Sequence, residues 1–370
     1  MQNPTVSFVV PCYKLAHLLP DCINSILSQS FRDFEILIMD DCSPDNTAEV
    51  AQSFRDPRVK YIRNDPNLGH LRNYNKGIAH SSGRYVWLIS ADDCLRRPYV
   101  LERYVEQLDR YPAVGYACCP GIGLKQNEET GILHYSVYAD RDLIVQGHKF
   151  LKKLIKGNFV LAASGLVRRE CYDRLGAFPL DMPWAGDWYL WSLFAIHFDV
   201  AYFAEPMVFY REHELSMTNT LMTKSIEALS EEDVGLVSSI KQKADAAGFY
   251  SVSRDCLRSL GYIYGHNMAS GRFHNCQKIM TWDEFEASLD RHISTEEEKV
   301  FIRSQACATM ADEYLSRGDK LSAKRYYQAC LDYDRWNAEV HMKRLFLAIG
   351  KPGKYLRKAL RSARDKGLIS

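Results

Sequence analysis

Residues 85–94, Tyr-Val-Trp-Leu-Ile-Ser-Ala-Asp-Asp-Cys, place two adjacent carboxylates directly after an apolar run. The run is short and rich in strand-forming residues, which predicts a buried strand rather than an exposed helix. Asp92 and Asp93 repel each other unless a positive group lies beside them. Because ligands of open α/β sheets bind at the carboxyl ends of strands, a divalent cation carrying a phosphate is the natural partner of this pair. An ordinary acidic turn is the alternative.

The sequence around this stretch alternates between strand and helix patterns. Uninterrupted apolar runs separated by amphipathic segments predict an α/β fold, with a doubly wound, mostly parallel sheet, helices on both faces and right-handed crossovers. The predicted strands cover residues 6–10, 34–39, 59–62, 85–89 and 114–118, and the predicted helical segments cover residues 18–27, 47–54, 67–79 and 99–108.

The pattern is less regular between residues 121 and 220. Beyond residue 220 it is helical throughout, which predicts a first domain of residues 1–220 and an all-helical C-terminal domain of residues 221–370. Apolar stripes on either side of Gly318-Asp319 predict a helical hairpin, either a tetratricopeptide-like unit or plain bundle packing. In the irregular region we predict strands at 162–167, 200–203 and 207–210, and helices at 170–175 and 187–197.

Composition sets the broad class of the protein. The 370 residues are 46% hydrophobic and 25% charged, as in soluble globular proteins of two domains. The formal net charge of +1 gives no field that attracts nucleic acid. Residues 1–4 lead straight into a strand pattern, so we expect no export signal and a cytoplasmic location. Eleven cysteines without Cys-x-x-Cys spacing indicate reduced thiols and argue against zinc.

The C-terminal segment 351–366 is basic, with seven Lys or Arg residues against Asp365 alone. Its apolar residues recur at helical spacing. Two interpretations stay open: peripheral contact with an anionic membrane at its inner face, or a solvated terminal helix. The sequence also leaves the oligomeric state open, a homo-oligomer included.

Short motifs occur along the chain in a characteristic order. Together, over about residues 5–218, they resemble the inverting family 2 glycosyltransferases, which have the nucleotide-sugar GT-A fold. The resemblance implies transfer of a sugar from a UDP-sugar, or another nucleotide-sugar, to a hydroxyl of a saccharide or lipid-linked acceptor. It also implies a place in cell-surface polysaccharide or lipopolysaccharide biosynthesis. The motifs are Pro11-Cys-Tyr-Lys14, Met39-Asp-Asp-Cys-Ser-Pro-Asp45, the segment 67–78, Ser90-Ala-Asp-Asp93, Gly186-Asp-Trp188 and Tyr210-Arg-Glu-His213.

The resemblance assigns residues to the nucleotide. Asp41 matches the position that accepts the uracil N3–H, and Tyr13, in the loop shaped by Pro11, matches an aromatic that stacks on the base. Arg72 and Arg211 are candidates to hold phosphate oxygens. The alternatives are a helix cap for Asp41, a turn position for Tyr13 and surface ion pairs for the two arginines.

The paired acids match the metal motif of the family. Asp93 corresponds to the direct ligand and Asp92 to a contact with the ribose, while His213 matches a position that completes metal or phosphate binding. Mg²⁺ or Mn²⁺ would neutralise the charge that grows on the leaving diphosphate. A lone histidine is otherwise usually structural. Ser90 stands where many family members carry a further Asp, so we expect the metal to be bound more weakly.

Asp187 matches the catalytic base of the family. An inverting transfer needs one base, which takes the proton from the acceptor hydroxyl, and no carboxylate nucleophile. Trp184 and Trp188 are candidates to contact the acceptor sugar, and their apolar surfaces would raise the pKa of Asp187. A helix cap for Asp187 and core packing for the tryptophans are the alternatives, and we expect Trp191 to belong to the core.

Two other functions are compatible with part of this pattern. A nucleotidyltransferase also uses paired carboxylates on a doubly wound sheet, but it needs a glycine-rich loop after the first strand, which the segment 11–14 lacks. A non-catalytic helical interaction protein with a degenerate front domain conflicts with the intact Asp41, Asp93 and Asp187. Lys14 and Gly186 replace common family residues and leave the donor sugar and the acceptor open.

Overall fold

The structure is a computed structural model that describes residues 3–214, 216–222, 226–270 and 279–349. The chain divides into two compact units, Met1–Thr223 and Lys224–Ser370, and each is described by itself. The predicted basic segment 351–366 lies outside the described residues. Among the described helices, none combines the length and the apolar character needed to cross a membrane.

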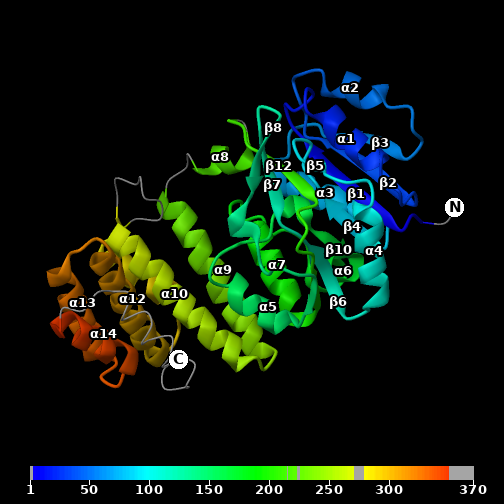
Figure 1. Ribbon diagram of the computed structural model, residues 1–370. Coiled ribbons are helices and arrows are strands. Elements are labelled where there is room, and N and C mark those ends of the chain that lie inside the picture. The colour runs from blue at the N-terminus through cyan, green and yellow to red at the C-terminus, as the bar shows by residue number, and fades with distance from the viewer. Residues whose placement is uncertain (1–2, 215, 223–225, 271–278, 350–370) are drawn as a thin grey trace. The chain divides into compact units, whose positions relative to one another are not determined.

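The first unit is built on an eight-stranded mixed sheet with the strand order β3-β2-β1-β4-β10-β6-β11-β9 (Figure 1). Strands β3, β2, β1 and β4 pair in parallel, and β11 is parallel to β6. Strands β10 and β9 run against their neighbours. The strands are β1 Val6–Cys12, β2 Phe34–Asp40, β3 Val59–Arg63, β4 Tyr85–Leu88, β6 Val114–Cys118, β9 Leu143–Val145, β10 Leu166–Arg168 and β11 Asp199–Tyr202.

A second sheet of four short strands has the order β5-β12-β7-β8. Its strands are β5 Cys94–Leu95, β7 Gly121–Lys125, β8 Glu128–Ile132 and β12 Val208–Arg211. The antiparallel pairing of β12 with β5 brings Arg211 beside Asp93, 118 residues away in the sequence. This sheet therefore joins two of the motifs that the sequence shows far apart.

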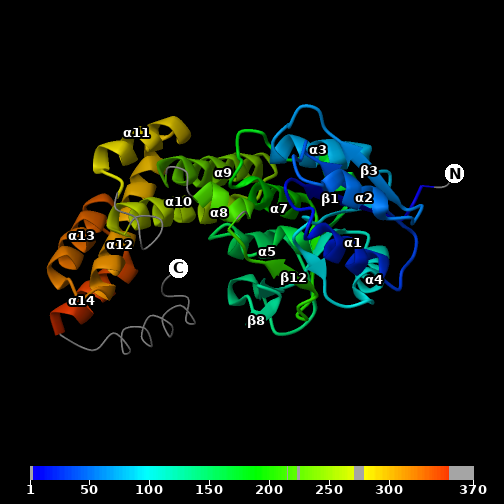
Figure 2. The same ribbon diagram turned by 90° about the horizontal axis from the view of Figure 1, so that it is seen from above.

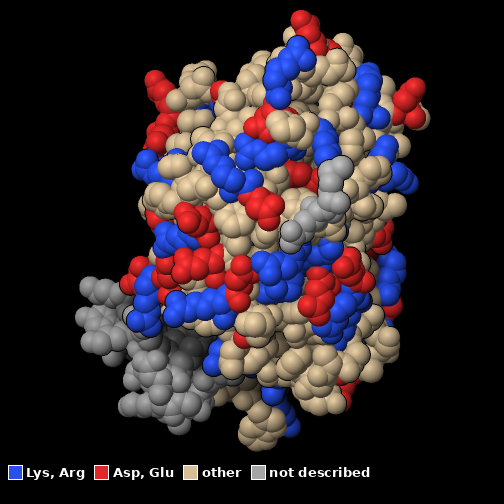
Figure 3. Space-filling model, turned by 90° about the vertical axis from the view of Figure 1, so that its right-hand side faces the viewer, with Lys and Arg blue, Asp and Glu red and all other residues tan. Residues whose placement is uncertain are grey.

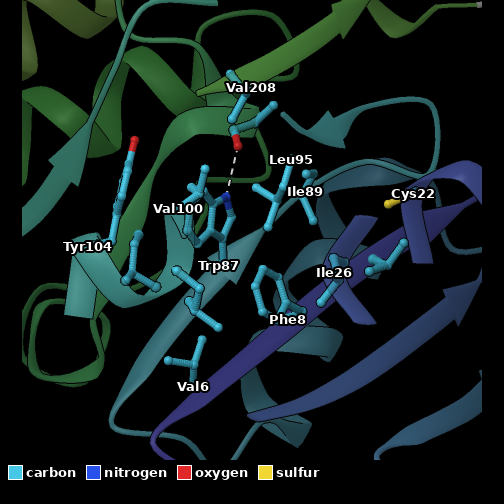
Figure 4. Close-up of a cluster of buried hydrophobic side chains, with 14 of the residues drawn as sticks. Val6, Phe8, Cys22, Ile26, Trp87, Ile89, Leu95, Val100, Tyr104 and Val208 are labelled. Carbon is cyan, nitrogen blue, oxygen red and sulfur yellow. Dashed lines mark hydrogen bonds between the residues drawn. The ribbon is translucent and has the colours of Figure 1, made fainter. Parts of the chain in front are cut away.

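Helices cover both faces of the large sheet. Helices α1 (Leu19–Leu27) and α4 (Val100–Arg110) pack on the face that carries Phe8 and Trp87, whose rings stack at 5.5 Å between centroids. In Figure 4 the indole N–H of Trp87 donates to the carbonyl oxygen of Ala163 at 2.8 Å. Because these side chains are fully buried and apolar, this layer is the main core of the unit.

Helix α3 (His70–His80) covers the opposite face, as Figure 2 shows. It lies so close to the sheet that a Cβ on Gly77 would be 2.3 Å from Cγ1 of Val9. Trp191 of α7 packs at 5.1 Å from the ring of Tyr116 in β6. The remaining helices of this unit are α2 Thr47–Ser53, α5 Gly147–Leu154, α6 Arg169–Leu175, α7 Gly186–His197 and α8 Met217–Met222, with 3₁₀ turns η1 His134–Ser136 and η2 Ala162–Ser164.

Every described element of the second unit is a helix. Helices α12 and α13 form a hairpin at Gly318, whose positive φ of 84° suits glycine, and the side chain of Asp319 caps α13. The rings of Tyr314 and Tyr326 stack across this hairpin at 5.4 Å. The helices are α9 Ile226–Ala246, α10 Tyr250–Ser270, α11 Trp282–His292, α12 Glu296–Ser316, α13 Lys320–Tyr333 and α14 Ala338–Ile349.

One predicted strand differs in the structure. Residues 162–167 do not form a single strand, because Ser164 N–H donates to Leu161 O and Gly165 N–H to Ala162 O, which makes the turn η2 before β10. Strands β5, β7, β8 and β9 and helices α5 and α8 were not predicted. Strand β8 is exposed at every position and so lacks an apolar alternation to reveal it.

Candidate active site

A cavity of about 260 Å³ opens at the carboxyl end of β4. Its walls come from α3, the segment that leads into η2, the start of α7, and α8. Most of the lining is apolar, with Tyr74, Leu88, Phe178 and Leu221 among its members. Two carboxylates, Asp93 and Asp187, line the same cavity. The structure thus brings together the predicted metal ligand and the predicted base.

Asp187 stands in the first turn of α7, where Ala185 occupies the N-cap position. The half-buried carboxylate accepts two hydrogen bonds: the backbone N–H of Trp188 donates to Oδ1 at 2.6 Å, and Asn158 Nδ2 donates to Oδ2 at 3.1 Å. Burial raises the pKa of Asp187 to about 6, against the lowering effect of these hydrogen bonds. Asp187 is therefore not the helix cap that the alternative interpretation required.

Asp92 and Asp93 lie in the turn that follows β4. The backbone holds this turn, since Ala91 N–H donates to Pro11 O at 3.1 Å and Asp93 N–H to Ser90 O at 3.0 Å. Asp93 is 6% exposed, and its Oδ1 accepts the backbone N–H of Arg211 at 3.0 Å. Burial and the charge of Asp92 raise the pKa of Asp93 well above its usual range.

Asp92 has one satisfied and one unsatisfied oxygen. Its Oδ2 lies 2.8 Å from Nε2 of His213, whereas its buried Oδ1 has no hydrogen-bond partner among the described residues. An unpaired buried carboxylate oxygen beside a second buried acid is costly unless a cation binds there. Oxygen ligands of this kind suit Mg²⁺ or Mn²⁺, so the donor atoms present fit the implied metal.

The protein supplies only part of a coordination shell at this place. Within the described ranges, no cluster of three or more His, Cys, Asp and Glu side chains is arranged to hold a metal ion. A cation at the paired acids would complete its shell from water and from substrate phosphate, as Mg²⁺ commonly does.

Arg211, a candidate phosphate ligand in the sequence, has its guanidinium engaged by protein acceptors. Its guanidinium is buried and donates from Nε to Asp92 O at 3.0 Å, from Nη1 to Asn127 Oδ1, and from Nη2 to Asp21 Oδ2 at 3.2 Å. The side chain thus ties α1 and the β7–β8 turn to the acid loop. With its Nε, Nη1 and Nη2 donors all engaged by protein acceptors, the guanidinium holds the two acids in position.

Asp41 is buried beside the turn that precedes α3. Its Oδ1 accepts hydrogen bonds from Asn64 Nδ2 at 2.9 Å and Leu68 N–H at 2.8 Å, and its Oδ2 accepts Gly69 N–H at 2.9 Å. The carboxylate therefore holds this turn, and it does not cap α2, whose N-cap is Asn46.

The other residues assigned to the nucleotide also lie outside the lining of the cavity. Pro11 is buried in β1, and Arg72 is exposed on α3. Tyr13 is 44% exposed, with Lys14 Nζ 5.1 Å from its ring centroid. An exposed ring is available for stacking.

The two predicted acceptor tryptophans both line the cavity but differ in exposure. Trp184 is half-buried. Trp188 is only 6% exposed, and its indole N–H donates to Leu154 O at 2.8 Å, so packing accounts for most of this side chain. Trp191 is a core residue, as expected.

Sequence reasoning missed three parts of the cavity. Asn158 lies in an irregular segment, His70 and Tyr74 lie within a motif without having been singled out, and α8 follows the last motif. None carries a sequence signal of its own, because each belongs to the site only through the packing of distant segments.

Comparisons with known proteins indicate the family that this chain resembles. The model of Glycosyl transferase family 2 matches residues 7–175. An uncharacterized glycosyltransferase of Rickettsia typhi is 26% identical over 225 residues, which cover 60% of this chain and 68% of that protein. The putative teichuronic acid biosynthesis glycosyltransferase TuaG of Bacillus subtilis is 30% identical over 120 residues, which cover 31% of this chain and 48% of that protein.

The fold is similar to that of S. aureus TarS 1–349, solved in complex with UDP-GlcNAc. The TM-score is 0.59 at 15% sequence identity, over 91% of this chain and 90% of that chain. This likeness confirms the predicted fold class, a mixed α/β sheet core followed by a helical C-terminal region.

Proposed function

Because this chain belongs to the family 2 glycosyltransferases, we propose that it transfers a sugar from a UDP-sugar to a hydroxyl of a saccharide or lipid-linked saccharide, with inversion and with a divalent metal. The observation that carries the proposal is the placement of Asp93 and Asp187 in one cavity. The similarity to TuaG supports a role in cell-surface polysaccharide biosynthesis. Family membership favours this function over the nucleotidyltransferase and the interaction protein.

In the proposed mechanism Asp187 is the base. Its carboxylate takes the proton of the acceptor hydroxyl while that oxygen attacks the anomeric carbon on the face opposite the leaving diphosphate. A pKa of about 6 leaves the group ionised at neutral pH and more basic than an exposed aspartate. The mostly apolar walls of the cavity suit the carbon face of a sugar ring.

Asp93 and Asp92 would hold the metal, with His213 hydrogen-bonded to Asp92. When bound, Mg²⁺ or Mn²⁺ would neutralise the charge that develops on the diphosphate. Arg211 keeps the two acids in place through its backbone N–H to Asp93 and its Nε–H to the carbonyl of Asp92.

The hydrogen bonds of Asp41 support a uracil base. A carboxylate has about four acceptor positions, and protein donors already fill two on Oδ1 and one on Oδ2. The single position left on Oδ2 matches one ring N–H, as in uracil. Guanine would present two adjacent donors, and Asp41 has room for only one of them.

We assign the reaction to the unit Met1–Thr223, which contains every proposed site residue, and propose that the helical unit is a separate domain. The metal, the UDP moiety, the acceptor class and the individual residue roles are all parts of this proposal.

The decisive experiment replaces the base without changing its shape. Wild-type protein is first assayed with Mn²⁺ and a panel of UDP-, GDP- and dTDP-sugars over a set of soluble saccharide acceptors, by release of free nucleotide. The variant Asp187→Asn should then lose transfer by at least about 100-fold while it binds UDP as the wild type does in calorimetry. The control is Asp181→Asn, an exposed aspartate just before α7, which should keep full activity. Full activity of Asp187→Asn would remove the base assignment.

A further inference from the structure

Asn158 reaches the proposed base from another part of the chain. It lies in the exposed turn between α5 and η2, 29 residues before Asp187, and it lines the same cavity. Its Nδ2 donates to Oδ2 of Asp187 at 3.1 Å. No motif of the sequence contains this residue.

The geometry fixes which end of the amide faces the base. The backbone N–H of Val160 donates to Asn158 Oδ1 at 3.1 Å, so Oδ1 is the acceptor and Nδ2 must point to the carboxylate. A flipped amide would lose both hydrogen bonds at once.

The turn that carries Asn158 is anchored on its inner side. Phe159 and Val160 are buried, and the ring of Phe159 packs at 5.0 Å from Phe150 and 5.6 Å from Tyr138. An exposed amide on an anchored backbone is held in place more firmly than one on a free loop.

The two oxygens of Asp187 are thereby fixed from two directions. Trp188 N–H holds Oδ1 from within α7, and Asn158, 29 residues earlier in the chain, holds Oδ2. Two hydrogen bonds to different oxygens set the plane of the carboxylate, and with it the direction of the lone pairs that remain.

We propose that Asn158 is a positioning residue for Asp187, which orients the carboxylate toward the acceptor hydroxyl and stabilises its ionised form. This inference rests on the proposed function, because it needs Asp187 to be the base. Hydrogen bonds to a carboxylate favour its charged state, so Asn158 opposes the effect of burial on the pKa of Asp187.

The other titratable groups around the cavity do not supply this stabilisation. Tyr74 of α3 and Tyr210 of β12 are neutral at pH 7, because burial raises the pKa of both, that of Tyr210 to about 12. His70 of α3 has its Nε2 3.1 Å from Pro183 O. Asp93 is an acid, and a negative charge there would disfavour ionisation of Asp187.

The test is the pH profile of kcat for Asn158→Ala. Without the donor, the acid limb should move up by roughly 0.5 to 1 pH unit, and kcat at pH 6.5 should fall by about 1.5- to 3-fold. The loss should shrink above pH 8, where the base is ionised in both proteins. The KM for the donor and the melting temperature should stay unchanged.

Two further variants sharpen the result. Asn158→Asp keeps the shape but places a second carboxylate against Asp187, so the pair should share a proton and the limb should move up by more than one unit. Lys156→Ala, in the exposed part of the same turn, should reproduce the wild-type profile.

An acid limb of Asn158→Ala that superimposes on the wild-type limb would overturn the inference, and so would an equal loss of kcat at every pH. Asp187→Asn separates the two proposals. If that variant is inactive while Asn158→Ala keeps the wild-type limb, only the role of Asn158 fails. If Asp187→Asn is active, the base assignment and the role of Asn158 fail together.

Discussion

At the scale of single residues, Asp93 and Asp187 share one cavity but differ in their partners. Asp93 lies beside a second acid and accepts a backbone N–H, an arrangement that suits a cation. Burial, and no second carboxylate, raises the pKa of Asp187, and its hydrogen bonds come from an amide and a backbone N–H. Because their surroundings differ, two aspartates in one cavity can have different roles, Asp93 as a metal ligand and Asp187 as a base in the proposed mechanism.

The raised pKa of Asp187 gives a prediction for the pH dependence of transfer. Only the ionised carboxylate accepts a proton, so kcat should rise as pH increases through about 6 and level off above pH 7. The measurement is kcat with saturating donor and acceptor between pH 4.5 and 8.5, with circular dichroism at each pH to confirm that the protein is folded. An acid limb centred near pH 4 would show that burial does not raise the pKa of Asp187 in solution.

The motifs of the sequence contain the candidate acids but few of the groups that surround them. Asp41, Asp93 and Asp187 stand in motifs at strand ends and at a helix start, where a residue type and its position are informative together. The three protein acceptors of the Arg211 guanidinium could not be foreseen, because they belong to segments distant in sequence. Asn158 was missed for the same reason.

At the scale of secondary-structure elements, the long apolar strands and amphipathic helices of the first 120 residues were predicted correctly. Of the small sheet only β12 was predicted, as the strand at 207–210, since β5 has two residues and β8 is fully exposed. Strands this short form through pairing with neighbours rather than through their own residue pattern. The sheet nevertheless matters for the site, because it brings β12 to the acid loop.

Because α3 packs so closely on the large sheet, one added methyl group at Gly77 should destabilise the first unit. Gly77→Ala should lower the free energy of unfolding of the first unit by about 1–3 kcal/mol, because the new Cβ would overlap Val9 Cγ1. The measurement is urea unfolding of the variant against the wild type.

The matched control for this prediction is Gly235→Ala in α9. There the nearest neighbour of a new Cβ is His292 Cε1 at an ordinary 3.7 Å, and alanine should stabilise the helix by roughly 0.5–1 kcal/mol. Equal stabilities for Gly77→Ala and wild type would show that α3 shifts away from the sheet at little cost.

At the scale of the whole molecule, charge is evenly balanced. The sequence has 47 Lys and Arg residues against 46 Asp and Glu residues. Figure 3 shows both signs interspersed over the face in view. No global field therefore steers an anionic donor, and recognition depends on the local groups of the site.

The confinement of the site to one compact unit predicts an independent donor domain. A fragment of residues 1–223 should bind UDP with Mn²⁺ in calorimetry with a Kd within about threefold of the full chain, because all proposed site residues lie in it. EDTA should abolish the heat in both proteins, which tests the metal. A fragment that is folded by circular dichroism but does not bind would show that the helical unit contributes to the donor site.

The position of β10 has a consequence for biosynthesis. Residues 166–168 insert between β4 and β6, two strands that precede them in the chain, and both neighbours pair with them. A nascent polypeptide emerging from the ribosome must therefore keep a gap in its central sheet until this late segment is translated. Premature termination before codon 166 would yield a product with two unsatisfied strand edges, prone to aggregation.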